Sequence, residues 1–372
     1  MLTNEGCRAR QRRLVDAMKR HGWDAFLTAD YRMVYYFTGA LGPAETPAIF
    51  LLSRDFGSIV VTPAKADAVA DQVLLLETYS IERTLTHLWS DACALLKVQP
   101  NWLSGKVGSE LGTLPAILQG AVESMSPKVA WADATHVVLA LRKSKEPDEI
   151  EEIRASLRYC KAAYRAAQET IEPGRTELDI YNAMFSAVVQ EAGTTIPFPG
   201  DFACGMRGIR GGGPPTRRTI QAGDLYILDI FPAPALYFGD TCRTFSAGPP
   251  TELQIQAWEL VLAALRLAEG RVKPGVRARE VYRAVKEFLD SHELAGKSFW
   301  HHAGHGIGHH GHEAPRIIPG SDDVFETGDV IAIEPGIYSE ALQGGIRLED
   351  NYVVRENGLE NLFDYPMELY RK

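Results

Sequence analysis

The sequence predicts two domains of different class: an α/β domain over residues 1–140 and an α+β domain with an internal repeat over residues 141–372. Three observations lead to this prediction. The chain has 372 residues, which is more than one compact core usually holds. Short apolar runs alternate with helical patterns in the first part, and a pair of motifs recurs in order in the second part.

The first domain is predicted from its alternating elements. Residues 25–28 and 57–61 are short apolar runs typical of buried strands, whereas residues 11–21 and 64–76 have helical patterns. Strands that alternate with helices indicate a layered α/β domain. The aromatic residues 35–39 predict a core strand and turn, and we expect no catalytic cluster in this domain.

The second domain is predicted to open on a long amphipathic helix. Pro147 and Asp148 suit a first helical turn, and Ile150, Ile153 and Leu157 follow at helical spacing. The preceding residues 141–147 mark the expected boundary between the domains.

Two motifs recur within the second domain. The turn before Thr176 is repeated 101 residues later, and in each copy a helix with a tyrosine follows. A Gly-Asp pair opens an apolar strand at Asp224 and again 105 residues later at Asp329. Two matches in order at nearly one offset predict that the domain consists of two related halves.

Composition limits the class of partner. Apolar residues make up 45% of the chain and charged residues 23%, both ordinary values for a globular protein. The net charge is −9 and there is no long run of lysine and arginine, which argues against a nucleic acid or an anionic membrane as partner. A small substrate, or a cationic one, fits better.

The N-terminal residues and the cysteines predict a cytoplasmic protein. The first residues are polar and acidic, unlike a signal peptide, and no apolar run reaches about 18 residues, so we expect no membrane span. The five cysteines are widely spaced and form no CxxC pair, which favours free thiols in a reducing compartment.

Five residues of the second domain predict a metal centre: Asp229, Asp240, His305, Glu334 and Glu349. Each half of the repeat supplies a carboxylate at the end of a strand and a second one further along. Four carboxylates in apolar surroundings need a cation, because an unpaired buried ion is costly. Oxygen ligands with one histidine suit two divalent metals, manganese in the first place, with cobalt, zinc or iron as alternatives.

His305 lies in a segment rich in histidine. Residues 300–313 contain six of the ten histidines, interleaved with glycines that allow close approach of the backbone. Since four carboxylates are present, one histidine suffices to complete two coordination shells.

The second domain resembles the pita-bread metallopeptidases, in particular the Xaa-Pro aminopeptidase and prolidase branch. The resemblance rests on Asp229 and on residues 239–244, 304–308, 312–315, 333–338 and 345–350. It implies a pita-bread catalytic domain with a pseudo-twofold repeat, preceded by a creatinase-like α/β domain that often helps to form dimers.

The resemblance also implies roles for the ligands. Asp229 would chelate one metal, Asp240 and Glu349 would bridge both, and His305 and Glu334 would bind the second. A hydroxide that bridges the metals would attack the carbonyl carbon of the bond before proline and so release the N-terminal residue.

Other residues would assist this reaction. Glu334 could accept a proton from the water, His312 would stabilise the oxyanion, and His301 would help to bind the substrate. Arg347 would support the site, and its alternative role is simply that of a charge partner for the carboxylates.

One departure from the family keeps a second function open. Gly211 to Gly213 occupy the place where family peptidases usually have a histidine before the first metal strand. The alternative is therefore a metal-dependent enzyme of the same fold that acts on a small molecule, as an amide hydrolase or a lyase. A binding module without catalysis is a third hypothesis, which the complete ligand set disfavours.

Overall fold

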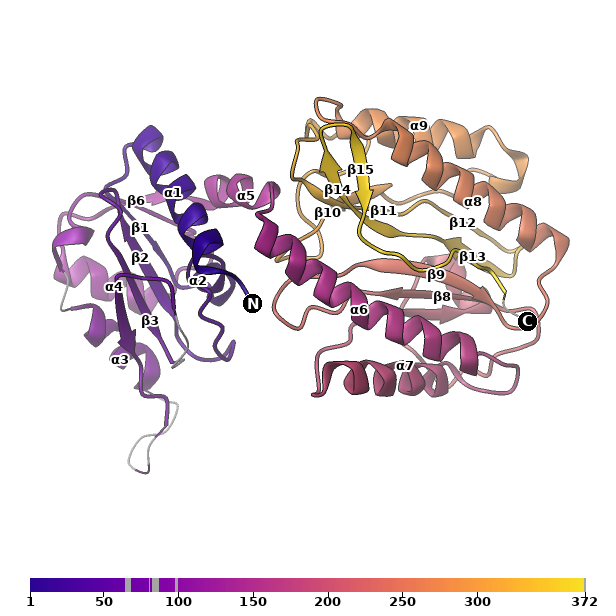
Figure 1. Cartoon of the computed structure of the whole chain (residues 1–372), viewed down its shortest axis with the longest axis horizontal. Coiled ribbons are helices and arrows are strands. Elements are labelled where there is room, and N and C mark those ends of the chain that lie inside the picture. The colour runs from indigo at the N-terminus through magenta and orange to yellow at the C-terminus, as the bar shows by residue number, and fades with distance from the viewer. Residues whose placement is uncertain (64–67, 80, 82–86, 98–99, 371–372) are drawn as a thin grey trace. The chain divides into compact units, whose positions relative to one another are not determined.

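The structure is a computed structural model that describes residues 1–63, 68–79, 81, 87–97 and 100–370. It contains two compact units, Met1–Arg142 and Lys143–Lys372, which are described separately (Figure 1). That residues 1–140 form an independent domain stays a prediction.

The first unit has a six-stranded mixed sheet in the order β4-β3-β2-β1-β5-β6. Its strands are β1 (Ala25–Thr28), β2 (Ile49–Ser53), β3 (Ser58–Thr62), β4 (Gln72–Leu75), β5 (Lys106–Ser109) and β6 (Ala130–Asp133). The pairs β1–β2 and β2–β3 are antiparallel, and the other three pairs are parallel.

Helices cover both faces of this sheet. They are α1 (Asn4–His21), α2 (Tyr31–Thr38), α3 (Leu88–Leu96), α4 (Ala116–Met125) and α5 (Thr135–Lys143), with a short 3-10 helix at Pro100–Leu103. On one face α1, α2 and α5 pack on Phe26 and Phe50, and on the other face α3 and α4 pack on Leu27 and Leu51. The predicted α/β class is thereby confirmed.

Two local predictions in this unit are wrong. Within residues 64–76, Gln72–Leu75 form the edge strand β4 rather than a helix, and residues 64–67 lie outside the described residues. The aromatic residues 35–38 are buried as predicted, but they belong to helix α2 and not to a strand.

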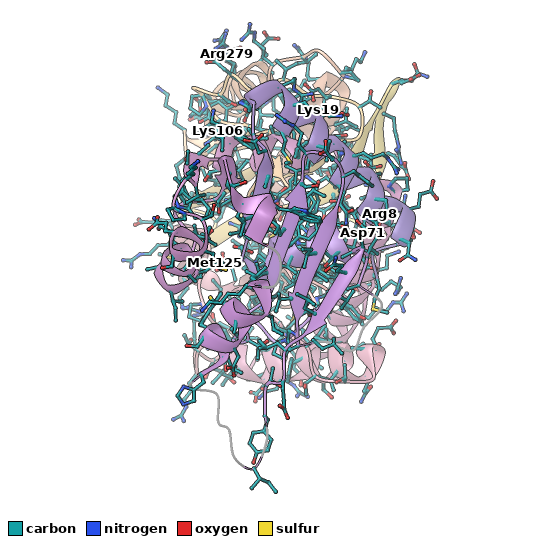
Figure 2. The ribbon with its side chains drawn as sticks, turned by 90° about the vertical axis from the view of Figure 1, so that its left-hand side faces the viewer. Arg8, Lys19, Asp71, Lys106, Met125 and Arg279 are labelled. Atoms are coloured by element: carbon teal, nitrogen blue, oxygen red, sulfur yellow. The ribbon has the colours of Figure 1, made fainter. Side chains whose placement is uncertain are left out.

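Polar contacts explain both outcomes. The carboxylate of Asp30 caps α2 by accepting from two backbone N–H groups, and Gly39 ends the helix with a positive φ of 70°. At β4, Asp71 accepts from Ser58 and pairs with Arg8 of α1 at 2.9 Å. Figure 2 labels Arg8 and Asp71 next to one another. These contacts fix the chain alongside β3 immediately before β4 begins.

The second unit contains the predicted repeat. Its first half is α6 (Pro147–Thr170), α7 (Glu177–Ala192), β7 (Gly200–Cys204), the 3-10 helix Gly205–Arg210, β8 (Leu225–Ile230) and β9 (Thr241–Ser246). Its second half is α8 (Glu252–Arg271), α9 (Ala278–Asp290), the 3-10 helix Glu293–Ala295, β10 (Gly304–Gly306), β11 (Val330–Ile333), β12 (Gly336–Ser339), β13 (Gly344–Arg347), β14 (Asp350–Arg355) and β15 (Gly358–Asn361).

Each half therefore runs from two helices into antiparallel strands. The sheets are β7-β8-β9 and β10-β11-β14-β15, with β12 and β13 as a separate hairpin. Figure 1 shows the strands of this unit between the helix pair α6 and α7 and the helix pair α8 and α9. In the part of the chain that the structure describes, every helix is too short or too polar to cross a bilayer.

Candidate metal centre and substrate cavity

The five predicted metal ligands lie at the ends of strands in the second unit. Asp229 belongs to β8 and His305 to β10, while Asp240, Glu334 and Glu349 directly adjoin β9, β11 and β14. All five are buried, with at most 8% of any residue exposed. Every candidate ligand therefore lies in a strand or directly next to one.

Strand pairing explains why the two halves of the repeat converge. Asp229 lies opposite Cys242 in the β8–β9 ladder, and Cys242 in turn pairs with Glu349 across an isolated antiparallel bridge. His305 lies opposite Ala332, two residues before Glu334. The bridge thus joins the two sheets at the position of the carboxylates.

The ligand atoms form overlapping groups. Asp229, Asp240 and Glu349 offer oxygens that all lie within 4.8 Å of one another, and so do the ligand atoms of His305, Glu334 and Glu349. Asp240 also falls in a group with His305. Asp240 and Glu349 are the residues that share one group with Asp229 and another with His305, so they lie between these two ends of the cluster.

Buried carboxylate oxygens without hydrogen-bond donors indicate that this cluster can bind cations. Asp229 Oδ1 and Glu349 Oε2 are buried and have no hydrogen-bond partner among the described residues, whereas Glu334 Oε1 lies 2.9 Å from His302 Nδ1 and 3.2 Å from His305 Nε2. Buried carboxylates without donors are costly, and divalent metals are the usual compensation. Four carboxylates and one imidazole therefore fit two hard or borderline divalent cations.

The pKa values of the candidate carboxylates reflect their burial and the charges around them. Burial, followed by repulsion from neighbouring carboxylates, raises the pKa of Asp240 and of Glu349 well above the usual range. Burial raises the pKa of Asp229 to about 6, although Arg347 opposes the shift. Burial also works against ionisation of Glu334, but the neighbouring histidines outweigh it and hold its pKa well below the usual range.

Arg347 joins the metal centre to the wall of a cavity. Its Nη2 atom donates to Asp229 Oδ2 at 2.5 Å, and its Nη1 atom donates to the carbonyl of Gly211 at 2.7 Å and to the Tyr338 hydroxyl at 3.2 Å. The guanidinium thus orients a predicted metal ligand and holds a cavity loop in place.

His301 and His312 lie beside the predicted ligands. The Nε2 atom of His301 is 2.8 Å from the Tyr338 hydroxyl oxygen, and the ring of His312 lies 3.9 Å from that of His305 between centroids. Burial lowers the pKa of both His301 and His312 to about 4, so both rings are neutral near pH 7.

Sequence reasoning missed three residues at this site. The Nδ1 atom of His302 is 2.9 Å from Glu334 Oε1, although the two atoms lack hydrogen-bond geometry. Tyr338 bonds Arg347, and Asp201 lies on the cavity wall. The histidine-rich segment was a signal for His302, but only strand register places Asp201 next to Asp229.

A cavity of about 460 Å³ opens onto the metal centre. Its lining consists of Asp201, Arg210, Gly211, Gly212, Gly213, Asp229, Trp300, His301, His302, Glu334 and Arg347. It therefore places the predicted ligands Asp229 and Glu334 within reach of a small substrate.

The side chain of Asp201 explains why glycines occupy the cavity loop, residues 211–213. A Cβ atom on Gly212 would lie 2.2 Å from the Asp201 carboxyl carbon, and the N–H of Gly213 donates to Asp201 Oδ1 at 2.8 Å. A histidine at Gly212 would displace Asp201, so this chain has a carboxylate with a glycine loop where a histidine was expected.

Comparison with known families decides the identity of the second unit. The description Metallopeptidase family M24 matches residues 151–356, more than half of the chain, and the Creatinase/Prolidase N-terminal domain matches residues 10–144. The chain belongs to metallopeptidase family M24. The resemblance seen in the sequence motifs is thereby confirmed.

Several curated relatives are similar to this M24 protein. An Xaa-Pro dipeptidase of Pyrococcus furiosus is 34% identical over 233 residues, which cover 63% of this chain and 66% of the relative. The Probable dipeptidase PepE of Mycobacterium tuberculosis is 33% identical over 246 residues, 63% of this chain and 62% of the relative. These matches span just under two thirds of each relative. An Xaa-Pro dipeptidase of Pyrococcus horikoshii is 26% identical over 361 residues, 96% of this chain and 97% of the relative.

Solved structures share the two-unit architecture. An Xaa-Pro dipeptidase from Bacillus anthracis superposes with a TM-score of 0.83 at 25% identity and covers 98% of this chain and 99% of its own. The prolidase from Pyrococcus furiosus gives a TM-score of 0.77 at 27% identity, covering 95% of this chain and 99% of its own. The predicted creatinase-like and pita-bread architecture is confirmed.

Proposed function

We propose that this M24 protein is a metal-dependent Xaa-Pro peptidase, which hydrolyses the bond between an N-terminal residue and proline. The observation that carries the proposal is the convergence of four buried carboxylates, two of which, Asp229 and Glu334, line a small cavity. The relatives named as dipeptidases favour a peptide substrate over the alternative of a small-molecule amide hydrolase or lyase.

Each candidate ligand has a proposed place. Asp229 would hold one cation, His305 and Glu334 the other, and Asp240 with Glu349 would bridge the two, since each of them shares groups with both Asp229 and His305. Two cations held in this way would supply Lewis-acid activation of water and of the substrate carbonyl.

The surrounding residues would guide the substrate and its protons. Glu334 faces the cavity and can accept a proton from the attacking water, because it is ionised at neutral pH. His312, neutral near pH 7, can donate a hydrogen bond to the developing oxyanion, and His301 can bind the substrate from the cavity wall. Arg347 would keep Asp229 in its ligand orientation.

The metal proposal is tested with purified protein loaded with Mn²⁺, Co²⁺, Zn²⁺ or Fe²⁺. We propose manganese as the native metal and expect two ions per chain by elemental analysis. Asp240→Asn should lose metal, because a bridging position serves both ions. Full occupancy in this variant would contradict the bridging role.

The activity is tested by release of the first residue from Ala-Pro, Ala-Pro-Phe and Ala-Ala. We expect cleavage of Ala-Pro and none of Ala-Ala, and Ala-Pro-Phe separates a dipeptidase from an aminopeptidase. Glu334→Gln should reduce kcat by at least about a hundredfold, while the exposed Glu356→Gln serves as the matched control. Metal-loaded protein that cleaves no Xaa-Pro peptide would overturn the proposal.

We further propose that the protein acts in the cytoplasm as a homodimer. All five cysteines are buried thiols outside any disulfide, which supports a reducing compartment. The dimer is proposed from the resemblance alone, and light scattering at micromolar concentration tests it by molar mass.

A further inference from the structure

Asp201 is a carboxylate in the cavity that stands apart from the candidate metal ligands. It lies directly opposite Asp229 in the β7–β8 ladder, so both side chains project from the same face of the sheet. Its side chain is 38% exposed, compared with 11% for Asp229 and 7% for Glu334. Asp201 therefore lies closer to the mouth of the cavity than the buried ligands do.

The orientation of this carboxylate is fixed by one of its oxygens. Asp201 Oδ1 accepts from the N–H of Gly213 at 2.8 Å, and its carboxyl group packs on Gly212 where a Cβ atom would otherwise lie. The other oxygen, Oδ2, is 3.5 Å from Arg347 Nη2, whereas the same nitrogen is 2.5 Å from Asp229 Oδ2. Arg347 is thus engaged mainly with Asp229, and Asp201 Oδ2 retains capacity for another cation.

Trp300 supplies an aromatic face in the same cavity. The residue is 60% exposed although it is a large hydrophobic side chain, and its ring is tilted against Tyr338 with 5.7 Å between centroids. The ring also lies against the loop, since a Cβ atom on Gly211 would approach it to 3.0 Å. An exposed indole and a fixed carboxylate together favour an ammonium or guanidinium group.

We propose that Asp201 and Trp300 form a specificity site for a cationic side chain, so that lysine or arginine is preferred as the residue before proline. The proposal rests on the proposed peptidase function. The Asp201 and Asp229 carboxylates both approach Arg347 Nη2, at 3.5 and 2.5 Å, so the side chain of a peptide bound at the metal centre can reach Asp201. The net charge of −9 also favours a cationic substrate.

Arg210 allows a second test of the cation preference, in which the expected change is opposite to that for Asp201. It is exposed and lines the same cavity, so its positive charge weakens the attraction for a cationic side chain. Removing this charge should strengthen the preference, whereas removing the charge of Asp201 should weaken it.

The experiment compares kcat/KM for Lys-Pro and norleucine-Pro, which have side chains of similar length and differ in charge. The Mn²⁺-loaded wild type should favour Lys-Pro by about fivefold or more. In Asp201→Asn and in Trp300→Leu this ratio should fall toward one, and in Arg210→Gln it should rise. The ratio is read within each variant, so general damage to the site cancels.

Two results would overturn the proposal: a wild-type ratio near one, or an Asp201→Asn variant that slows both dipeptides equally and keeps the ratio. If neither dipeptide is cleaved, the peptidase function itself fails. Because neither dipeptide is then cleaved, calorimetric binding of both to the Mn²⁺-loaded wild type and Asp201→Asn makes the same comparison without turnover. Equal affinity of the wild type for both dipeptides would reject the cation site by itself.

Discussion

At the scale of single residues, buried charge is placed where a partner of opposite charge is available. Arg243 is fully buried and donates to the Glu349 carbonyl at 2.8 Å and to Asp350 Oδ1 at 2.8 Å. The side-chain nitrogen of Asn351 donates to the Asp240 carbonyl at 2.5 Å. Both bridging candidates are therefore held through their own backbone, which leaves their carboxylates available for metal.

Glu110 is only partly compensated, by the charge of Arg142 and a hydrogen bond from Thr28, and gives a prediction for the first unit. Burial and the neighbouring Asp30 raise its pKa from 4.5 to about 7, while Thr28 donates only one hydrogen bond at 3.2 Å. In the unfolded chain the carboxyl ionises from about pH 4.5, whereas in the folded protein it stays protonated up to about pH 7. Stability is therefore lost as pH rises through this window, and the loss is complete above it.

Glu110→Gln should remove this loss, because glutamine is neutral at every pH. We expect the variant to be more stable than the wild type by about 2 kcal/mol at pH 8, and the difference to vanish at pH 4. Denaturant unfolding, followed by hydrogen exchange of β1 and β5, measures this difference in stability between the variant and the wild type. The exposed Glu45→Gln is the control, and an equal gain at both pH values would refute the assignment.

At the scale of elements, the sequence predicts helices and strands that have long, regular patterns, and it fails where a short apolar run fits either a helix or a strand. Helices α6 and α7 and strands β8 and β11 lie where capping signals, helical spacing and the Gly-Asp repeat predict them. Strand β4 has four residues at a sheet edge, and its apolar run is compatible with either a helix or a strand.

The same limit applies to the site. Asp229, Asp240, His305, Glu334 and Glu349 could be proposed as ligands from residue type and motif spacing, and the structure brings them together. Asp201 could not be proposed from the sequence. It lies next to Asp229 only because of the register between β7 and β8, and a slip of one residue would turn the Asp201 side chain to the other face of the sheet.

Strand β10 provides a prediction about backbone proximity. A Cβ atom on Gly306, next to the proposed ligand His305, would lie 2.1 Å from the backbone oxygen of Ala314. Gly306→Ala must therefore shift one of the two backbones, and we expect a loss of about 2 kcal/mol or more in stability and of metal at the His305 position. Gly320→Ala is the matched control, since nothing lies within 4 Å of its Cβ position.

Thermal unfolding and elemental analysis measure both effects of Gly306→Ala. If this variant kept wild-type stability and two metal ions per chain, the close approach of β10 to the segment at Ala314 would not constrain the ligand.

At the scale of the whole molecule, the two units differ in what stabilises them. The first has two apolar layers on the faces of one sheet, and its described residues include none of the groups that could hold a metal. The second has an apolar cluster between α8, α9 and their sheet, but it also encloses four carboxylates whose mutual repulsion opposes folding without a cation. Metal should therefore stabilise the second unit and leave the stability of the first unit unchanged.

Removing the metal tests this difference. A ligand that binds only the folded state stabilises it by about 2.7 kcal/mol at a hundredfold excess over its Kd. After chelation by EDTA we expect faster hydrogen exchange in β8, β11 and β14, with unchanged exchange in β1, β2 and β3. Readdition of Mn²⁺ should restore protection, and Asp240→Asn should already exchange like the chelated protein. Equal deprotection of both units would mean that their stabilities are coupled, whereas no change in the second unit would show that its carboxylates are neutralised by protons instead of metal.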